Sequence, residues 1–268
     1  MRHALLEYTD QRCVQQLLSQ TKFEPSISRR IDVLSRHFLG YSYRSNPLIG
    51  AADTDEVFTA ALDGFDCVTY IETILALARA SKVADFTESL RTIRYQQGRI
   101  EWSSRNHYMT LWIRNNLSEG LIGPFSTPGV PLINRERLLN VVPGLPVRRT
   151  CLRCVPKRAI ARLQSYLQTG DLIFFASTRK NLDVFHTGIL VHNGERLMMR
   201  HASRSQGRVV EQKLGDFIKA NRMAGVIVVR PQEVTQQAVR NSIKLRRGVT
   251  SRAGLTQKAA TAKRQSQV

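Results

Sequence analysis

The chain has 268 residues, a formal net charge of +19 at pH 7 and a hydrophobic content of 42%. This composition indicates a globular protein with a substantial core, and four cysteines are too few for a disulfide scaffold. The longest apolar run, near Ile71 to Ala80, contains Glu72 and Arg79, so no segment is predicted to span a membrane.

The charge predicts an anionic partner, which is nucleic acid, an acidic membrane surface or a polyanion such as bacterial cell wall. Residues 236–268 contain eight lysines or arginines and no acidic residue, which indicates a basic, disordered tail. The N-terminus lacks the apolar segment of a secretory signal. We therefore expect a cytoplasmic protein, export to the cell envelope by a non-classical route, or a true start further upstream.

Apolar residues at helical spacing predict two helices between Asp10 and Gly40. Loop is expected over 41–47, and 51–63 is expected to be a connection. Asp85, with Glu88 three residues later, predicts the capped start of a further helix that continues to Gly98.

Between these helices, the stretch 64–73 predicts a helix that begins at a cysteine. Asp66 occupies the position of an N-cap, and apolar residues recur at helical spacing from Val68. Cys67 would then lie in the first turn, where the helix dipole and free N–H groups favour a thiolate and can lower a thiol pKa from about 8.5 to ~3.5–7.5. The alternative is a buried cysteine that only fills space.

Residues 103–112 fit a helix that places His107 near Leu111 and Tyr108 near Trp112, which by itself favours a core helix. Gly and Pro predict mostly loop over 123–146. Cys151 and Cys154 form a CxxC pair, but a structural zinc site needs a second pair of ligands that the chain lacks, so no metal is expected and a local disulfide stays open. Residues 156–170 predict a short helix.

After residue 171 the pattern changes to short strands, over 172–175, 186–191, 196–201 and 225–229. The chain is therefore predicted to be α+β, with a helical N-terminal part packed on a C-terminal antiparallel sheet. Asn193-Gly194 predicts a two-residue type I′ hairpin turn, and this register places His186 directly opposite His201 on one face. Near a thiol, His186 would act as the base and His201 would orient it.

These motifs resemble the NlpC-type papain-fold cysteine amidases of bacterial cell-wall metabolism. The resemblance rests on Phe65-Asp66-Cys67 opening a helix, on Gly170-Asp171-Leu172 and His186-Thr187-Gly188 opening strands, and on His201-Ala202-Ser203 after a hairpin. The runs 38–43, 66–73 and 105–108 with Trp112 resemble more narrowly the N-acetylmuramoyl-L-alanine amidase-like branch, over roughly residues 13–231.

The resemblance implies one papain-like amidase domain over residues 1–232, followed by the tail over 233–268. It implies a Cys67 nucleophile, a His186 base and His201 as third polar residue, without a cofactor. The substrate would be a muropeptide or peptidoglycan, cleaved between N-acetylmuramic acid and L-alanine. The residues implied in substrate binding are Tyr43, Asp66, Arg105, Asn106, His107 and Tyr108.

The chain departs from this family in two places. Ser42 stands where relatives usually have proline, and the basic tail has no counterpart. The tail could contact an anionic polymer. Two other functions stay open: a papain-like protease or acyltransferase acting on proteins, and a catalytically silent polyanion-binding protein. Few aromatic residues and no recognised nucleic-acid module argue against nucleic acid as the partner.

Overall fold

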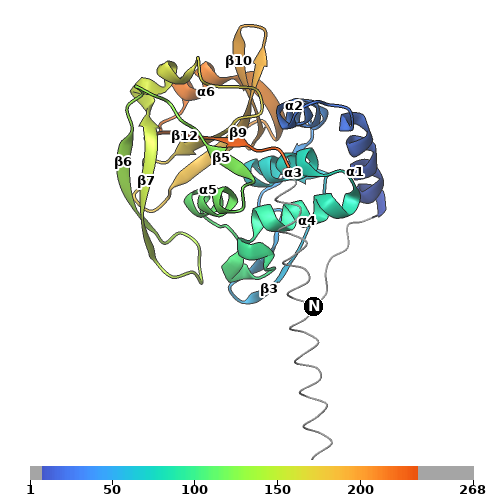
Figure 1. Cartoon of the computed structure of the whole chain (residues 1–268). Helices are drawn as coiled ribbons and strands as arrows, with labels where there is room; N and C mark the ends of the chain where they lie inside the picture. The colour runs from blue at the N-terminus through green and yellow to red at the C-terminus, as the bar shows by residue number, and fades with distance from the viewer. Residues whose placement is uncertain (1–7, 235–268) are drawn as a thin grey trace, which may run out of the picture. The chain divides into compact units, whose positions relative to one another are not determined.

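The computed structural model describes residues 8–234, so the tail predicted over 236–268 lies outside the described residues. Most of the helices come from the first half of the chain (Figure 1). They are α1 (Tyr8–Thr21), α2 (Ile27–His37), α3 (Cys67–Arg79), α4 (Val83–Arg94), α5 (Met109–Ser118) and α6 (Leu214–Ala220), with 3-10 helices η1 (Gln96–Gly98), η2 (Trp102–Ser104) and η3 (Lys157–Leu163). None of the helices within residues 8–234 is long and apolar enough to cross a membrane.

Most strands join one sheet, in the order β4-β1-β11-β10-β9-β8-β12-β7-β6, with β5 also paired to β12. They are β1 (Ser42–Tyr43), β4 (Gly64–Phe65), β5 (Ile122–Pro124), β6 (Ile133–Leu139), β7 (Arg148–Pro156), β8 (Leu172–Ala176), β9 (Val184–Asn193), β10 (Arg196–Ser203), β11 (Arg208–Lys213) and β12 (Gly225–Pro231). Neighbouring strands are antiparallel except β1 and β4. A separate hairpin pairs β2 (Ile49–Ala51) with β3 (Thr54–Val57).

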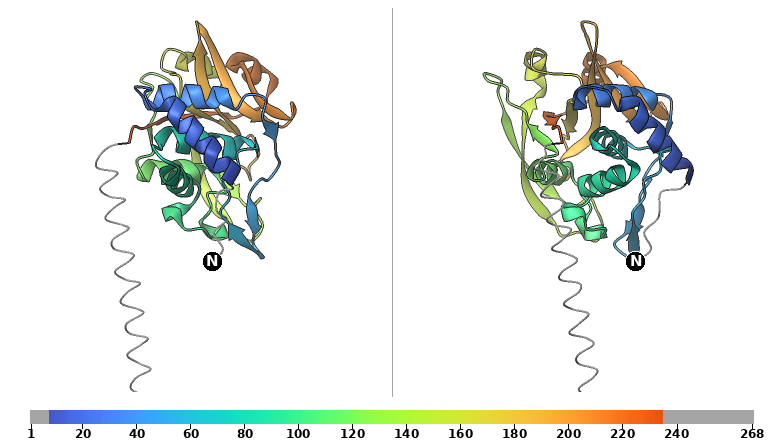
Figure 2. Two further views of the ribbon diagram at one scale, coloured as in Figure 1. Left: turned by 90° about the vertical axis from the view of Figure 1, so that its right-hand side faces the viewer. Right: turned by 45° about the vertical axis from the view of Figure 1, so that its right-hand side comes forward.

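Helix α3 lies in the middle of the molecule, with other elements on all sides (Figure 2). All its residues from Thr69 to Ala78 are buried, because α2, α4 and strands β9 and β10 pack around it. A helix enclosed in this way is apolar on every side rather than along one stripe. Burial therefore holds the first residue of α3, Cys67, at a fixed place beside the sheet.

The other face of the sheet carries a second core. Phe175, Leu190 and Met199 of the central strands pack there against Phe217 of α6 and Ile160 of η3. Because β8 has apolar neighbours on both faces, its sequence Leu-Ile-Phe-Phe-Ala is a continuous apolar run. β9 and β10 are more mixed and carry His186, Arg200 and His201 among their apolar residues. The chain is thus α+β, with helices on one side of the antiparallel sheet and a smaller layer on the other.

The longer strands that the sequence analysis missed, β6, β7 and β11, are rich in polar residues. Region 123–146, predicted as mostly loop, contains the end of β5 and all of β6, and β7 and β11 were also not predicted. β6 reads Ile-Asn-Arg-Glu-Arg-Leu-Leu and has an exposed face, so apolar alternation does not mark it. The loop predicted over 41–47 holds β1, the connection predicted over 51–63 holds β3, and 156–170 contains a 3-10 helix in place of the predicted helix.

The predicted capping box at Asp85 is wrong. Helix α4 begins at Val83, two residues earlier, and its N-cap Lys82 makes no side-chain capping bond. The Asp85 carboxylate instead accepts a 2.6 Å hydrogen bond from the Ser81 hydroxyl. The carboxylate therefore faces the preceding loop, where it still stabilises the positive end of the helix dipole.

Candidate active site

Helix α3 begins at Cys67, as the sequence predicts, because Asp66 forms a complete capping box. Asp66 Oδ1 accepts hydrogen bonds from the backbone N–H of Val68 at 3.0 Å and of Thr69 at 2.7 Å. In return, Thr69 Oγ1 accepts from the backbone N–H of Asp66 at 3.0 Å. The first turn is thus closed around a cysteine, with the Asp66 carboxylate occupied in the cap.

Tyr43 lies close to Cys67 through the pairing of β1 with β4. Tyr43 pairs with Phe65, two residues before the cysteine. Burial raises the pKa of the Tyr43 phenol, and the nearby Cys67 and Asp66 raise it further, against a Ser45 hydrogen bond and the Arg204 cation that lower it. The phenol therefore stays neutral at neutral pH, near enough to Cys67 and Asp66 to feel their charge.

The two histidines of the predicted pair are in direct contact. His186 Nε2 lies 2.7 Å from His201 Nδ1, and the rings meet edge to face at 88° with centroids 4.7 Å apart. His186 also lies parallel to the Phe217 ring, at a centroid distance of 5.2 Å. Phe175 completes the apolar surroundings of this ring.

The hairpin register that predicted this contact is wrong by two residues. Asn193 pairs with Arg196 and Leu190 with Met199, so the loop is Gly194-Glu195 rather than Asn193-Gly194. Gly194 has a φ of 60°. A type I′ turn needs positive φ at both central residues, but in the described chain Asn46 and Gln97 are the only non-glycine residues with positive φ. Neither Asn193 nor Glu195 is among them, so the turn is not the predicted type I′. A shift by two residues preserves the face of each strand, so His186 and His201 become diagonal instead of directly opposed neighbours.

Gln212 on β11 determines which protons this pair carries. His201 Nε2 lies 3.2 Å from Gln212 Oε1, and an amide oxygen only accepts hydrogen bonds, so His201 Nε2 is the donor. A neutral His201 then has a bare Nδ1, which accepts from His186 Nε2–H. His186 in turn keeps its Nδ1 unprotonated, which is the state a general base requires. The sequence analysis missed Gln212 because β11 itself was not predicted.

Burial keeps both histidines neutral. It lowers the pKa of His186 to about 3, with a further contribution from neighbouring His201. The pKa of His201 is also lowered by burial, against the Gln212 hydrogen bond that raises it. The pair therefore enters the reaction uncharged at neutral pH.

The expectation of a preformed Cys67 thiolate is wrong. Burial, and then the Asp66 carboxylate, raise the pKa of the Cys67 thiol to about 12. Backbone hydrogen bonds at Thr187, Cys67 and Val68 favour the thiolate but do not outweigh these two effects. The same aspartate that caps the helix therefore also holds the proton on the sulfur.

The structure brings Cys67 to β9, the strand that carries His186. The thiol contacts the backbone at Thr187, the residue after His186 on β9. Within residues 8–234, the hydrogen bonds of Cys67 do not include one to His186. A catalytic hydrogen bond is often loose in the absence of substrate, so this placement leaves the pairing of Cys67 with His186 as a proposal.

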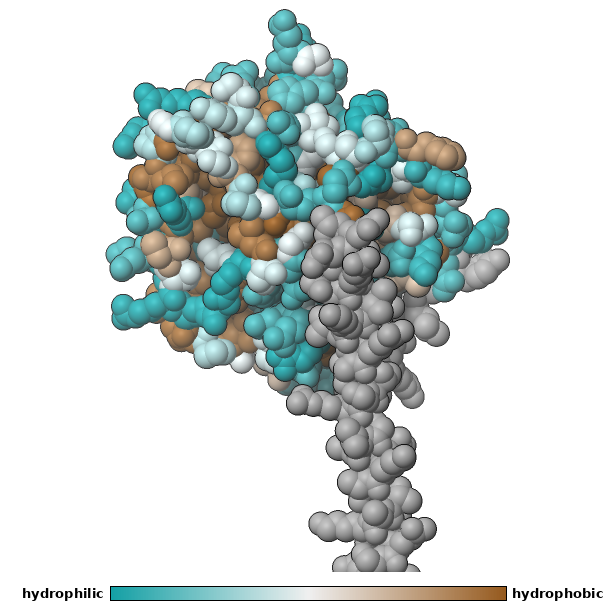
Figure 3. All heavy atoms as spheres, viewed as in Figure 1, coloured by the Kyte–Doolittle hydropathy of each residue, from teal (hydrophilic) through white to brown (hydrophobic). Residues whose placement is uncertain are grey.

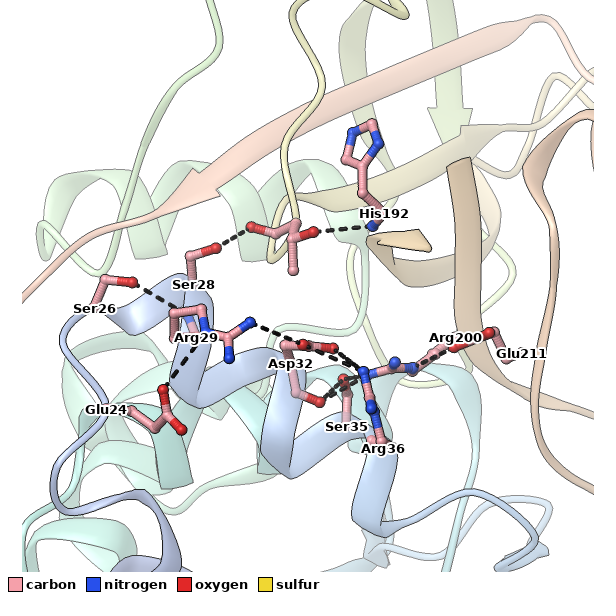
Figure 4. Close-up of polar contacts among 11 residues, drawn as sticks. Glu24, Ser26, Ser28, Arg29, Asp32, Ser35, Arg36, His192, Arg200 and Glu211 are labelled. Carbon is pink, nitrogen blue, oxygen red and sulfur yellow. Dashed lines mark hydrogen bonds and ion pairs between the residues drawn. The ribbon is translucent and has the colours of Figure 1, made fainter. Parts of the chain in front are cut away.

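A buried ion network on the opposite face of β10 and β11 fixes these strands to α2 (Figure 4). Arg200 donates to Glu211 Oε2 at 2.8 Å and to Asp32 Oδ1 at 2.9 Å, and also bonds the Ser35 hydroxyl. Because successive strand residues face opposite sides, Arg200 and Glu211 lie behind His201 and Gln212. The network therefore holds the two strands that carry the histidine partner and its amide.

The side chains of Arg105–Tyr108 bond to residues other than Cys67, His186 and His201. Arg105 forms an ion pair with Glu56 at 3.0 Å and stacks over Trp102, whose carbonyl lies 2.7 Å from His107 Nε2. Asn106 bonds the backbone of Ile93, and the Tyr108 hydroxyl accepts from Val141 and Val142. The helix predicted over 103–112 begins only at Met109, so these side chains lie on a loop that ties several elements together.

The CxxC pair does not form a disulfide. Cys151 and Cys154 both lie on β7, and both are free thiols. Cys151 is exposed and Cys154 is buried, because strand residues three apart point to opposite faces. Across residues 8–234, no group of three or more histidine, cysteine, aspartate or glutamate side chains is arranged to hold a metal ion.

Comparison with known proteins places this chain in a family. A Legionella pneumophila protein of the DUF1460 family has 22% identity and a TM-score of 0.77, over 88% of this chain and 99% of that one. An N-acetylmuramoyl-L-alanine amidase of Bacteroides uniformis has 21% identity and a TM-score of 0.67, over 83% of this chain and all of that one. These similarities show a common fold. No curated protein sequence matches this chain.

The family comparison covers most of the domain and includes Cys67, both histidines and Gln212. The profile of the N-acetylmuramoyl-L-alanine amidase-like family matches residues 33–226. The chain therefore belongs to the N-acetylmuramoyl-L-alanine amidase-like family.

Proposed function

We propose that this chain is a cysteine amidase with a papain-like, NlpC-type active site. Its substrate would be a peptidoglycan fragment, and the bond cleaved would join N-acetylmuramic acid to L-alanine of the stem peptide. Membership of the family supports an amidase acting on cell-wall material. The single observation that carries the cysteine mechanism is the chain of hydrogen bonds from Gln212 through His201 to His186, which leaves His186 Nδ1 unprotonated on the strand that the Cys67 thiol contacts at Thr187.

In the proposed reaction, the resting pair is a neutral thiol and a neutral imidazole. His186 Nδ1 takes the Sγ proton as the sulfur attacks the carbonyl carbon of the muramic acid lactyl group. The Cys67 backbone N–H lies at the free end of α3 and stabilises the resulting oxyanion. This description makes proton transfer part of the attack, since the raised thiol pKa leaves little thiolate beforehand.

The second half of the reaction reverses the roles of the histidine. His186 gives its Nδ1 proton to the L-alanine nitrogen, the amide C–N bond breaks, and the lactyl group remains on Cys67 as a thioester. His186 then takes a proton from water, whose oxygen attacks the thioester. The lactyl carboxylate leaves and the thiol is restored. Throughout, His201 accepts the hydrogen bond of His186 Nε2 and stabilises the imidazolium.

Among the residues that the family resemblance assigns to substrate, Tyr43 has the strongest structural support, because it pairs with Phe65, two residues before Cys67, and the charge of Cys67 influences its phenol. Asp66 is proposed to act through the helix cap and the thiol pKa. Arg105, Asn106, His107 and Tyr108 are proposed to support the wall of the substrate groove, since their polar atoms are already bonded to protein.

Mass spectrometry of muropeptide digests tests this function directly. Release of intact stem peptide that begins with L-alanine is the expected product, and cleavage within the stem peptide would contradict the assigned bond. Cys67→Ala and His186→Ala should abolish turnover, while Cys13→Ala and His192→Ala serve as matched controls. Turnover in either active-site variant would refute the cysteine mechanism, and cleavage of a protein substrate at a similar rate would favour a protease.

A further inference from the structure

Strands β6 and β7 form a hairpin with an unusual surface. We name residues 132–156 the β6–β7 arm. Of the eight large hydrophobic residues that are exposed in the described chain, four lie within sixteen residues of this arm: Leu132, Leu138, Val141 and Val147. Val147 is 62% exposed. Exposed apolar residues that gather in one place mark an interaction surface more often than scattered ones do.

Cations surround these apolar residues. Arginine and lysine outnumber aspartate and glutamate by seven to two over residues 133–156 and 177–183. One of the two acids, Asp183, is buried and caps α5 through Thr110. The exposed cations are Arg135, Arg148, Arg149 and Arg153 on the arm, with Arg179 and Lys180 in the adjoining loop. In the part of the chain that the structure describes, none of these six forms an ion pair.

The backbone of the arm is anchored to the domain, so its exposed side chains have a fixed arrangement. The Tyr108 hydroxyl accepts hydrogen bonds from the N–H groups of Val141 at 3.1 Å and Val142 at 3.3 Å. Leu138 N–H donates to the Lys180 carbonyl at 2.9 Å, which joins the loop that carries Arg179 and Lys180 to the arm. Arg149 pairs across the hairpin with Leu138. Cations and apolar side chains therefore share one edge of the molecule.

The view in Figure 3 shows this mixture on the surface. Hydrophobic and strongly hydrophilic residues lie next to each other on the left of the molecule, where Figure 1 places β6 and β7. The ten residues 138–147 contain no charge, and arginines follow at once at positions 148 and 149. An uncharged, partly exposed loop flanked by cations is the pattern of a surface that touches lipid with its loop and phosphate headgroups with its flanks.

We propose that the β6–β7 arm docks this protein onto an anionic lipid bilayer. Arginines at the loop base would bind lipid phosphates, and Val141 and Val147 would enter the boundary between headgroups and acyl chains. A glycan or nucleic acid fits less well, because residues 132–156 contain no aromatic side chain to stack on a sugar or a base. A partner bound through charge alone would also leave the exposed Val141 and Val147 without a role.

The test uses the full chain and vesicles of phosphatidylcholine with and without phosphatidylglycerol. Arg148→Gln combined with Arg149→Gln should weaken binding to the anionic vesicles by about fivefold per arginine. Val141→Ser combined with Val147→Ser should weaken it as well, and most clearly at high salt. The matched control is Arg114→Gln with Leu117→Ser, which removes an exposed arginine and an exposed leucine from α5. The basic tail is present in every variant, so it cannot account for a difference.

The outcomes separate this proposal from its alternatives. Equal vesicle binding by the arm variants and the control would overturn it. Loss of binding in the arginine variant alone, with an equal loss on purified sacculi or DNA, would show a general polyanion surface and would also overturn it. Hydrolysis of soluble muropeptides should be the same in all variants, so failure of the docking proposal leaves the proposed amidase function untouched.

Discussion

His186 Nε2 and His201 Nδ1 lie 2.7 Å apart, and Gln212 Oε1 lies 3.2 Å from the other nitrogen of His201. This order of atoms has one consistent assignment of protons when both rings are neutral. The amide accepts from His201, His201 accepts from His186, and His186 Nδ1 is bare. The predictions on activity depend on this assignment, and each changes a different member of the series.

Replacing His201 by phenylalanine removes the acceptor for His186 Nε2–H. The imidazole of His186 can then adopt the other tautomer and turn in its site, so kcat should fall by about 10²-fold or more. KM should change little, because His201 is proposed to act through His186 and not on the substrate. Steady-state kinetics on a purified muropeptide measure both. His192→Phe, on the strand that carries His186, is the control, and an unchanged kcat in His201→Phe would contradict the role of the pair.

Gln212 allows a sharper test, because two substitutions have opposite effects. Gln212→Leu allows His201 to carry its proton on Nδ1, so that His201 Nδ1–H would face His186 Nε2–H. This arrangement loses the hydrogen bond that orients His186, so kcat should fall by about tenfold or more. Gln212→Glu keeps an acceptor and should retain most of the activity. Its carboxylate also favours an imidazolium, so the acid limb of kcat/KM should move to higher pH. A merely structural glutamine would not produce this shift, and identical profiles would rule the assignment out.

The raised pKa of Cys67 predicts slow alkylation. With a thiol pKa of about 12, the thiolate fraction keeps rising above pH 9, so the rate of iodoacetamide reaction at Cys67 should continue to rise there. Asp66→Asn retains a capping side chain and removes the charge that raises the pKa, so it should accelerate the reaction. Peptide mass spectrometry follows Cys67 and the exposed Cys151 separately. A plateau near neutral pH would instead show a preformed thiolate.

The sequence predicted the elements that are marked by short local patterns of residues. Asp66 caps its own helix, and strands β8 and β9 are mostly apolar, so the helix start and these central strands followed from short patterns. The contact of His186 with His201 was also predicted, although through a register that is wrong by two residues. The predicted contact is still present because a register shift of two residues keeps both side chains on the same face of the hairpin.

The parts that sequence reasoning missed depend on distant partners. The thiol pKa depends on how deeply the folded chain buries Cys67, and no pattern near residue 67 carries that information. Gln212 and Glu211 are polar residues in a strand, and each is explained only by a residue on the neighbouring strand, His201 or Arg200. The segment 105–108 looked like a helix with a polar face, but its side chains bond to Glu56, Ile93 and the loop near Val141.

A buried ion pair beneath the site predicts a large effect on stability. Arg94 Nε lies 2.7 Å from Glu72 Oε2, both side chains are at most 3% exposed, and Trp112 Nε1 donates to the other carboxylate oxygen. Arg94→Met leaves the Glu72 charge buried without its partner, which should cost about 3–5 kcal/mol. The double variant Arg94→Met, Glu72→Gln should recover part of this loss. Urea unfolding measures both, and equal stability of the single variant and the wild type would contradict the prediction.

The lowered histidine pKa values predict a loss of stability on acidification. His186 binds a proton below its usual pKa of 6.5 when unfolded, but only near pH 3 when folded, so between these values the unfolded state holds the extra proton. Its contribution to stability is therefore present above pH 6.5 and lost as the pH falls toward 3. From pH 7 to 5, this histidine alone should reduce the free energy of unfolding by up to about 2 kcal/mol.

His186→Leu isolates this contribution. Leucine fits the apolar contacts with Phe175 and Phe217 and carries no proton, so the variant should lose less stability between pH 7 and pH 5 than the wild type does. Urea unfolding at the two pH values gives the four free energies required, and His192→Leu on the exposed end of β9 is the control. Equal slopes in His186→Leu and the wild type would mean that His186 is already solvated, and then the neutral pair would not be the resting state of the site.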